Sequence, residues 1–532
     1  MPLMLMFCLL AGDRLPSADL NLRLAAPIAT WDEAVPLGNG LLGGLLWGQD
    51  GTLRLSLDRG DLWDERPARG VPWERFNYAE MVRLKQAGRI DEINRIFDNP
   101  YNGVYPTKIP AGRLELDLPD GARLESFELD LASAEGRAHL ADGRAVRCFF
   151  DANQPVAMME LPGEPRALRL RAPESVKKLG YADPVLGREA GADWFVQQAA
   201  GDLRYCVLVA RRRVGPNTLL AITVTSSVDS PDPRALAARR CAQALDRGYE
   251  RLASEHRRWW GRFWSASAVS IPQDDILRHY YLVQYFHGAA SRRGAPPMPL
   301  QGVWTADAGG LPPWKGDYHN DLNTQMTYIA YQAAGHFDEG LSFLDFNWNL
   351  LPRYRRFAKE FYGVDGAAVP GVMTLHGEPL GGWGQYSLSP TMGAWVGHLF
   401  YLHWRYTQDS EFLRTRALPW CREVGTALRA LMKVDPADGR LKLPLSTSPE
   451  IHNASLRAFL TPMTNYDLAC SKTLFVALAQ MAKAAAQPAE AAEWQTAADR
   501  LGDFHTRPDG TLQLDAKEDL SESHRHLSNL IG

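Results

Sequence analysis

One stretch of the chain, residues 312–326, gathers side chains that could bind a sugar and move protons. A Pro-Pro pair precedes Trp314, and from Asp317 onward nearly every position carries a hydrogen-bonding group. An ordinary helix start needs one capping side chain rather than a run of donors and acceptors. Amides and carboxylates suit hydroxyl groups, and aromatic rings suit the apolar faces of sugars. The stretch indicates a carbohydrate pocket; the alternative is a loop capped by Asn320 or Asp321.

A second loop, residues 376–386, contains the same kinds of residue between glycines and a proline. Glu378 could accept hydrogen bonds from hydroxyl groups, and Trp383 could stack on a sugar ring. We therefore add Glu378 and Trp383 to the candidate substrate-binding residues.

Composition limits the class of protein. The chain has 532 residues, 45% of them hydrophobic, which is enough for two or more domains. The net charge is −4 and no basic block occurs, which argues against a nucleic-acid partner. The six cysteines are widely scattered, without metal-ligand or disulfide spacing, so we expect buried free thiols and no metal site. Nothing in the sequence indicates a cofactor or an oligomeric state.

The first 18 residues resemble an export signal. An apolar run extends from Met1 to Gly12, but no basic residue precedes it and Pro16 is unfavourable near a cleavage site. We expect a periplasmic or secreted protein; the alternatives for this segment are a disordered tail or an added strand. No later run approaches the 18 apolar residues of a membrane span.

Residues 19–230 have the pattern of an antiparallel β-sandwich. Alternating apolar residues occur at 53–57, 114–118 and 168–171, and more loosely at 220–224, with Gly, Pro and Asp between the runs. One helix, at about 78–97, interrupts them. Residues 231–264 then form a long amphipathic pattern, and we interpret 231–274 as a helical linker.

From residue 275 the apolar residues no longer recur at every second position, as in a strand, but about every 3.6 positions, as in a helix. We expect helices at residues 275–291, 322–335, 337–361, 390–407, 410–433, 466–486 and 488–502. Helical hairpins in series with long loops suggest an α/α toroid. A six-hairpin toroid needs twelve helices, so we expect 275–532 to be an incomplete (α/α)6 barrel, and the whole chain to be a multidomain α+β protein.

Five motifs follow one another along the chain: WDEAVPLGNGLLGGLLWG at 31–48, LQGVW at 300–304, PPWKGDYHNDLN at 312–323, SPE at 448–450 and HRHLS at 524–528. In sequence and in order they resemble the motifs of glycoside hydrolase family 95, a family of inverting α-1,2-L-fucosidases and related α-L-galactosidases. The resemblance spans nearly the whole chain. It implies a β-super-sandwich, a helical linker and a catalytic (α/α)6 barrel, followed in the family by a C-terminal β-domain that this sequence does not include.

The resemblance also implies roles for individual residues. Glu450 corresponds to the general acid, and Asn323 to the second of two asparagines that handle the water. Asp321 stands where the first asparagine is expected, and unlike an amide it can accept a proton. The family's later aspartate, in a Gly-Trp-Ser segment, has no counterpart here, so the base is either Asp321 or outside this sequence.

The remaining matched positions imply a sugar-binding subsite. His319, Arg525 and His526 correspond to residues that contact the sugar, and Trp314 is a stacking candidate. We therefore expect Asp321, Asn323, Glu450 and His526 to converge, with an oligosaccharide or glycoconjugate as the substrate.

Two other functions remain open from the sequence. The chain could be a catalytically inactive carbohydrate-binding fragment, because the family's base is not found. It could also be a glycoside phosphorylase of a related barrel clan, whose phosphate loop would lie beyond Gly532. The sequence does not distinguish fucose from L-galactose, and it does not identify the linkage.

Overall fold

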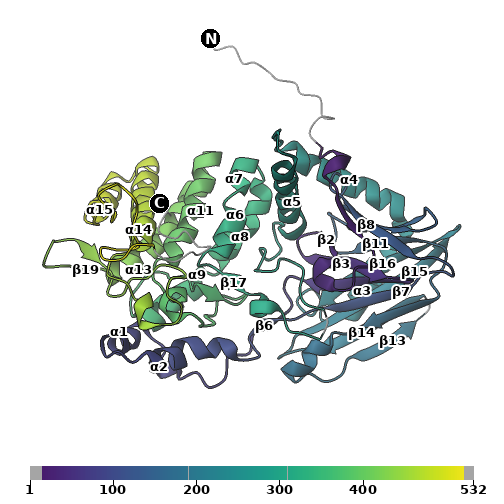
Figure 1. Cartoon of the computed structure of the whole chain (residues 1–532), viewed down its shortest axis with the longest axis horizontal. Helices are drawn as coiled ribbons and strands as arrows, with labels where there is room; N and C mark the ends of the chain where they lie inside the picture. The colour runs from purple at the N-terminus through teal and green to yellow at the C-terminus, as the bar shows by residue number, and fades with distance from the viewer. Residues whose placement is uncertain (1–14, 190, 308, 521–532) are drawn as a thin grey trace, which may run out of the picture. The chain divides into compact units, whose positions relative to one another are not determined.

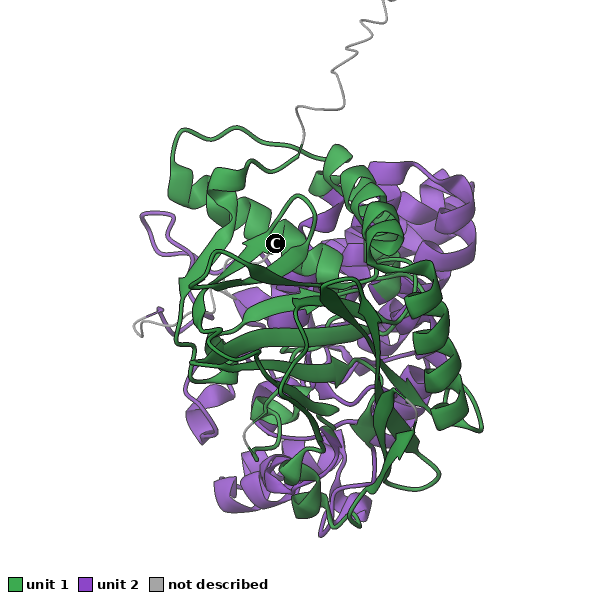
Figure 2. Ribbon diagram, turned by 90° about the vertical axis from the view of Figure 1, so that its right-hand side faces the viewer, with its two compact units in different colours: residues 1–64, 108–316, 333–342 green, residues 65–107, 317–332, 343–532 purple. Residues whose placement is uncertain are grey.

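The computed structural model describes residues 15–189, 191–307 and 309–520. The chain divides into two compact units, coloured separately in Figure 2. The β-sheet unit comprises the described parts of residues 1–64, 108–316 and 333–342. The helical unit comprises the described parts of residues 65–107, 317–332 and 343–532. These units differ from the ranges expected from sequence, because residues 65–107 group with the helical unit and residues 231–316 with the β-sheet unit.

The β-sheet unit contains two antiparallel sheets (Figure 1). The larger sheet has the strand order β1 (Leu22–Ala25), β8 (Leu124–Asp130), β9 (Glu135–Leu140), β10 (Ala145–Phe150), β11 (Ala157–Pro162), β16 (Asn217–Ser226), β15 (Arg204–Val214), β14 (Ala192–Gln198) and β13 (Val185–Glu189). The smaller sheet has the order β12 (Ala167–Arg171), β7 (Gly112–Asp117), β4 (Thr52–Arg59), β3 (Leu42–Gln49) and β2 (Val35–Gly38). The expected antiparallel sandwich is confirmed, and each of the four alternating runs lies in a strand.

The two sheets pack through apolar side chains. Phe150 of the larger sheet is buried against Gly44 of the smaller one, where an added Cβ would lie 2.5 Å from its ring. Leu37 of β2 likewise occupies the space beside Gly136 of β9. In β4 the three alternating leucines are buried because the period of a strand places them on one face.

Helices α3 (Pro233–Arg247) and α4 (Tyr249–Ser265) belong to this unit. The sequence predicts one helix, but Gly248 separates the two with a φ of 77°, in the left-handed region that glycine adopts readily. The buried face of α3 packs on β15 and β16, and the Cys241 thiol donates to the Ala221 carbonyl oxygen at 3.3 Å. Helix α5 (Asp274–Ala290) also packs in this unit, where the Tyr285 hydroxyl donates to the Pro36 carbonyl oxygen at 2.7 Å.

The glycine-rich motif at 31–48 includes β2, most of β3 and the tight turn that joins them. The Asn39 side chain accepts hydrogen bonds from the Leu41 and Leu42 backbone, as a tight turn requires. Gly40 has a φ of 88° and donates its N–H to the Ala289 carbonyl oxygen at 2.7 Å. A Cβ at Gly43 would lie 1.9 Å from the Val303 carbonyl oxygen. The glycines therefore also allow other backbone segments to approach closely.

The helical unit begins with α1 (Tyr78–Gln86) and α2 (Ile90–Ile93), where one helix was expected over 78–97. Its other helices are α6 (Asn323–Tyr328), α9 (Leu351–Phe357), α10 (Gly384–Ser387), α11 (Met392–Thr407), α12 (Ser410–Phe412), α13 (Leu418–Leu431), α14 (Asn465–Ala484) and α15 (Pro488–Asp499). Helices α7 (Tyr331–Ala334) and α8 (Phe337–Asn349) have residues in both units. The short strands of the helical unit are β17 (Tyr318–His319), β18 (Val372–Met373), β19 (Lys433–Val434) and β20 (Leu441–Lys442). Strand β5 (Trp63–Asp64) belongs to the β-sheet unit, and β6 (Thr107–Lys108) has one residue in each unit.

The expected helical C-terminal part is confirmed, although several helices are interrupted. The expected helix at 410–433 contains a π-helical segment, Leu413–Ala417, before α13. Pro419 explains this interruption, because proline has no N–H to donate to the carbonyl four residues earlier. Helices α11, α13 and α14 pack together through buried residues such as Leu399, Leu428 and Leu474 (Figure 1).

Within the described ranges, no helix combines the length and the apolarity needed to cross a membrane. Most of the expected export segment at 1–18 lies outside the described residues, and the periplasmic or secreted location stays a prediction.

Candidate active site

The loop that carries His319 and Asp321 is held by hydrogen bonds within the helical unit. Strand β17 pairs antiparallel with β18, and His319 lies opposite Val372. Beyond the strand, the Asn320 N–H donates to the Gly371 carbonyl oxygen at 2.5 Å, and its side-chain amide to the Pro370 carbonyl oxygen at 3.1 Å. The loop backbone is therefore fixed on both sides of His319.

His319 forms a buried ion pair with Asp317. Its Nδ1 contacts Asp317 Oδ1, and the Tyr101 hydroxyl donates to the other oxygen, Oδ2, at 2.7 Å. Burial by itself would lower the pKa of His319, but Asp317 and the carboxylates of Asp321 and Glu450 raise that pKa to about 9. The imidazole is therefore positively charged at neutral pH, beside acidic groups.

Asp321 is a buried carboxylate without a capping function. The N-cap of α6 is Leu322, and no side chain makes a cap hydrogen bond there, so the helix-cap alternative for Asp321 is not supported. Among the described residues, Asp321 Oδ1 has no hydrogen-bond partner. Burial raises the pKa of Asp321, the positive charge of His319 lowers it, and the negative charges of Glu450 and Asp317 raise it further. Together these effects give a pKa of about 6. Asp321 is thus ionised at neutral pH, and one of its buried oxygen atoms makes no hydrogen bond to the described residues.

Glu450 lies in the loop between β20 and α14, and its side chain is half-buried. Its negative charge raises the pKa of both Asp321 and His319, which places it near both groups. Glu450 is 127 positions from Asn323 in the sequence, so only the tertiary structure brings this carboxyl group to the 317–323 loop.

Asp467, in the first turn of α14, holds the loop before Glu450. It accepts hydrogen bonds from the Ser446 hydroxyl and, at 3.2 Å, from the Thr447 N–H. The Thr391 hydroxyl donates to its other oxygen at 2.6 Å. Asp467 was not predicted from the sequence, although Thr464 and Asp467 have the spacing of a capping box. The Thr464 side chain accepts a hydrogen bond from the Asp467 N–H.

The other missed residues are Asp317 and Tyr101. Asp317 lies two positions before His319, and this spacing places both on one side of an extended segment. The role of Tyr101 could not be predicted from the sequence, because its hydrogen-bond partner Asp317 is 216 positions away.

Trp383 lies beside this cluster. Its ring centroid is 5.7 Å from that of His319 and 5.0 Å from that of Tyr101. Asn323 is the first residue of α6, two positions after Asp321, and is half-buried. Trp383 therefore lies beside His319, and Asn323 lies close to Asp321 in the chain.

Glu378 lies with a different group of residues. It pairs with Arg353 at 2.7 Å and with Arg356 at 2.8 Å, at the edge of a separate pocket. Trp314 is 57% exposed and belongs to the β-sheet unit. Arg525 and His526 lie outside the described residues. The proposed sugar-binding roles of these four residues stay predictions.

The arrangement suits proton transfer. It combines two neighbouring carboxyl groups, Asp321 and Glu450, with a positively charged imidazole that favours the ionised form of one of them. Within the part of the chain that the structure describes, no group of three or more His, Cys, Asp or Glu side chains is placed to hold a metal ion.

Two regions of the chain match models of known families. Residues 272–532 match the catalytic domain of glycosyl hydrolase family 95, and residues 22–157 match the N-terminal domain of glycosyl hydrolase family 65. The "Probable alpha-fucosidase A" of Aspergillus niger is 24% identical, over 98% of this chain and 76% of its own. The "Alpha-L-fucosidase 2" of Arabidopsis thaliana is 23% identical, over 97% of this chain and 72% of its own.

The fold resembles that of a solved structure. A "Putative kojibiose phosphorylase from human microbiome" superimposes with a TM-score of 0.61 at 11% identity, over 93% of this chain and 70% of its own. At this identity the likeness concerns the fold alone. The catalytic-domain match and the two relatives that align over nearly the whole of this chain show the family: the chain belongs to glycosyl hydrolase family 95.

Proposed function

We propose that the chain hydrolyses terminal α-L-fucosyl residues, or the closely related α-L-galactosyl residues, of oligosaccharides with inversion at the anomeric carbon. The names of the two relatives that align over nearly the whole of this chain support fucose as the sugar. The observation that carries the proposal is the buried Asp321 carboxylate, which has an unpartnered oxygen and lies near both His319 and Glu450.

In the proposed reaction Glu450 donates a proton to the leaving oxygen as the glycosidic bond breaks. A water molecule bound between Asp321 and Asn323 attacks the anomeric carbon from the opposite face, and Asp321 takes its proton. The Asn323 amide orients the water, and the positive charge of His319 keeps Asp321 ionised. His319, Arg525, His526 and Trp314 are proposed to bind the sugar.

The test compares Glu450→Gln with Asp321→Asn on an aryl α-L-fucoside and on a natural fucosyl disaccharide. An aryl leaving group departs with little protonation, so Glu450→Gln should slow the disaccharide far more than the aryl substrate. Asp321→Asn should slow both substrates about equally, by ~10²-fold or more if Asp321 is the base. Unchanged rates in Asp321→Asn would exclude Asp321 as the base.

Two further measurements separate the alternatives. NMR of the first product formed should show the anomer opposite to that of the substrate. Turnover should not depend on inorganic phosphate; a sugar phosphate as product would instead identify a phosphorylase. Binding of fucosides without any turnover would identify a carbohydrate-binding protein that lacks activity.

A further inference from the structure

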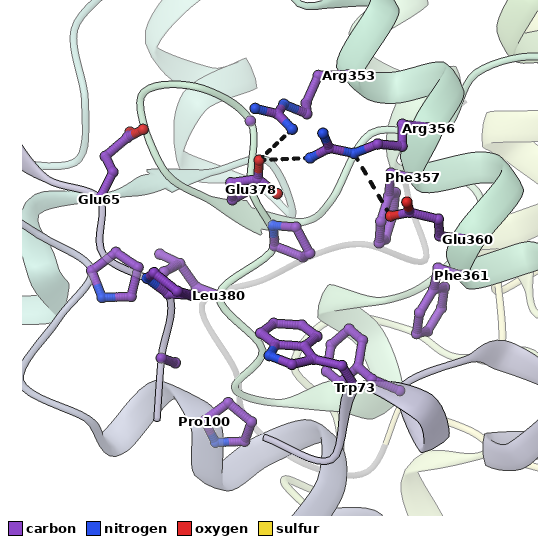
Figure 3. Close-up of a pocket in the computed structure, with 16 residues that line it drawn as sticks. Glu65, Trp73, Pro100, Arg353, Arg356, Phe357, Glu360, Phe361, Glu378 and Leu380 are labelled. Atoms are coloured by element: carbon purple, nitrogen blue, oxygen red, sulfur yellow. Dashed lines mark hydrogen bonds and ion pairs between the residues drawn. The ribbon is translucent and has the colours of Figure 1, made fainter. Parts of the chain in front are cut away.

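The helical unit contains a pocket with a volume of about 650 Å³, and its lining does not include the cluster around Asp321 (Figure 3). Its walls come from residues 65–106, 353–361 and 377–380. We propose that this pocket is a second carbohydrate-binding site that holds neutral sugar rings of an oligosaccharide. The volume lies within the range of roughly 300–1,000 Å³ that is usual for ligand pockets. The proposal concerns binding alone and does not depend on hydrolysis.

Trp73 provides a stacking surface at one side of the pocket. The side chain is 48% exposed, although tryptophan is usually well buried. Its ring packs edge-on against Phe76, with centroids 5.3 Å apart, and Phe76 packs in turn on Phe361 at 5.4 Å. Phe361 stacks on Phe357 at 5.2 Å. A row of packed aromatic rings therefore fixes an exposed indole, as stacking on the apolar face of a sugar requires.

A polar group lies at the other side. In the view of Figure 3, Arg353 and Arg356 both reach Glu378 at the top, and Trp73 lies at the bottom. Arg356 also approaches Glu360, at 3.7 Å. Each guanidinium group has five N–H donors in a fixed plane, more than these contacts use. Glu378 and the two arginines thus present acceptors and donors together, which suits the hydroxyl groups of a sugar.

The charges of the pocket compensate one another. Glu378 and Glu360 pair with the two arginines, and Glu65 forms an ion pair with His376 and accepts its backbone N–H at 3.0 Å. A phosphate or a uronate would have to compete with these carboxylates for the arginines. The balance therefore favours a neutral ligand over an anionic one.

The pocket is preformed, and it shares its loops with the candidate active site. Four prolines line it: Pro67, Pro100, Pro106 and Pro379. Proline restricts the backbone, so little conformational entropy remains to be lost on binding. Pro100 precedes Tyr101, and a Cβ at Gly382, next to Trp383, would lie 2.9 Å from the Tyr101 ring. The same two loops therefore form part of both sites.

The experiment measures binding of neutral oligosaccharides that contain no fucose or galactose in α-L linkage: lactose, cellotetraose and maltotetraose. Titration calorimetry of the full chain should show binding of at least one of them. Trp73→Ala should weaken that binding by about tenfold or more, because a stacking surface is lost. Arg356→Met, which keeps the length of the side chain, should also weaken it. Aryl-fucoside hydrolysis should be unchanged in both variants.

Tyr406→Ala is the matched control, since Tyr406 is 55% exposed and does not line the pocket. It should bind the oligosaccharide as the unmodified chain does. Absence of binding by all three oligosaccharides would overturn the proposal, as would unaltered binding in Trp73→Ala and Arg356→Met. Tighter binding of digalacturonate than of the neutral sugars would overturn the preference for a neutral ligand. None of these outcomes depends on whether Glu450 and Asp321 are catalytic.

Discussion

At the scale of single residues, the candidate active site depends on three side chains at alternate positions. Asp317 and His319 lie on one side of an extended segment, because side chains two positions apart share a face, and Asp321 follows in the turn before α6. Tyr318 points away from them and packs on Phe346, with ring centroids 4.9 Å apart. The result is a buried group of alternating charge, in which the positive charge of His319 lowers the pKa of Asp321.

This group of charges predicts how the rate depends on pH. If ionised Asp321 is the base, kcat/KM should rise with pH through about 6, the pKa of Asp321. His319→Gln removes the positive charge that lowers this pKa while burial continues to raise it. The rise should then move to higher pH, by about 1–3 units. The measurement is the pH profile of kcat/KM on an aryl α-L-fucoside.

His139→Gln is the control for that profile, because His139 is in β9 of the β-sheet unit. Its profile should match that of the unmodified chain. A His319→Gln profile with measurable rates and an unmoved rise would show that another group titrates.

At the scale of elements, the start of α14 positions the loop that carries the proposed acid. Asp467 is buried in the first helical turn, and three hydrogen bonds join it to residues 446, 447 and 391. Burial raises the pKa of Asp467, and these hydrogen bonds oppose the shift. One carboxylate thus links α14, the start of α11 and the loop before Glu450.

We expect Asp467→Asn to displace that loop, because an amide offers one acceptor oxygen where the carboxylate offers two. A misplaced acid should slow hydrolysis of a fucosyl disaccharide by about 10- to 100-fold and affect an aryl fucoside much less. The ratio of the two rates is the measurement. Asp499→Asn, at the exposed end of α15, should leave the ratio unchanged. An equal loss on both substrates would indicate general unfolding instead of a misplaced acid.

At the scale of the whole molecule, both units bury their cysteines. Cys148, Cys206 and Cys241 lie in the β-sheet unit, Cys421 and Cys470 lie in the helical unit, and all five are free. Burial raises the pKa of each thiol, that of Cys206 to about 12. The expected buried free thiols are confirmed for these five, and Cys8 lies outside the described residues.

These thiols should report unfolding. The thiolate is the reactive form, and neither reagent nor base reaches a buried thiol. The five cysteines should therefore react with a disulfide reagent such as DTNB only when the chain unfolds in guanidinium chloride. Rapid reaction of several thiols in native buffer would contradict the burial described here. The extent of thiol reaction, measured as a function of denaturant concentration, gives the unfolding transition of both units.

The sequence alone determined those features that depend on neighbouring residues. The strand at 53–57 and the helices near 392–407 and 465–484 could be predicted, because burial of one face imposes a period of 2 or 3.6 on the sequence itself. The motifs at 31–48, 312–323 and 448–450 were sufficient to indicate the family. The residue types at Gly248 and Pro419 indicate the two helix interruptions, but the periodicity of the apolar residues does not.

Only the tertiary structure decided the properties that depend on distant residues. It groups residues 65–107 with the helical unit, although they follow strands of the sandwich in the sequence. It separates Glu378, paired with Arg353 and Arg356, from Trp383 five positions later, which lies beside His319. The sequence could not distinguish a helix cap from a buried carboxylate at Asp321, because its pKa depends on burial and on charges brought together by the fold.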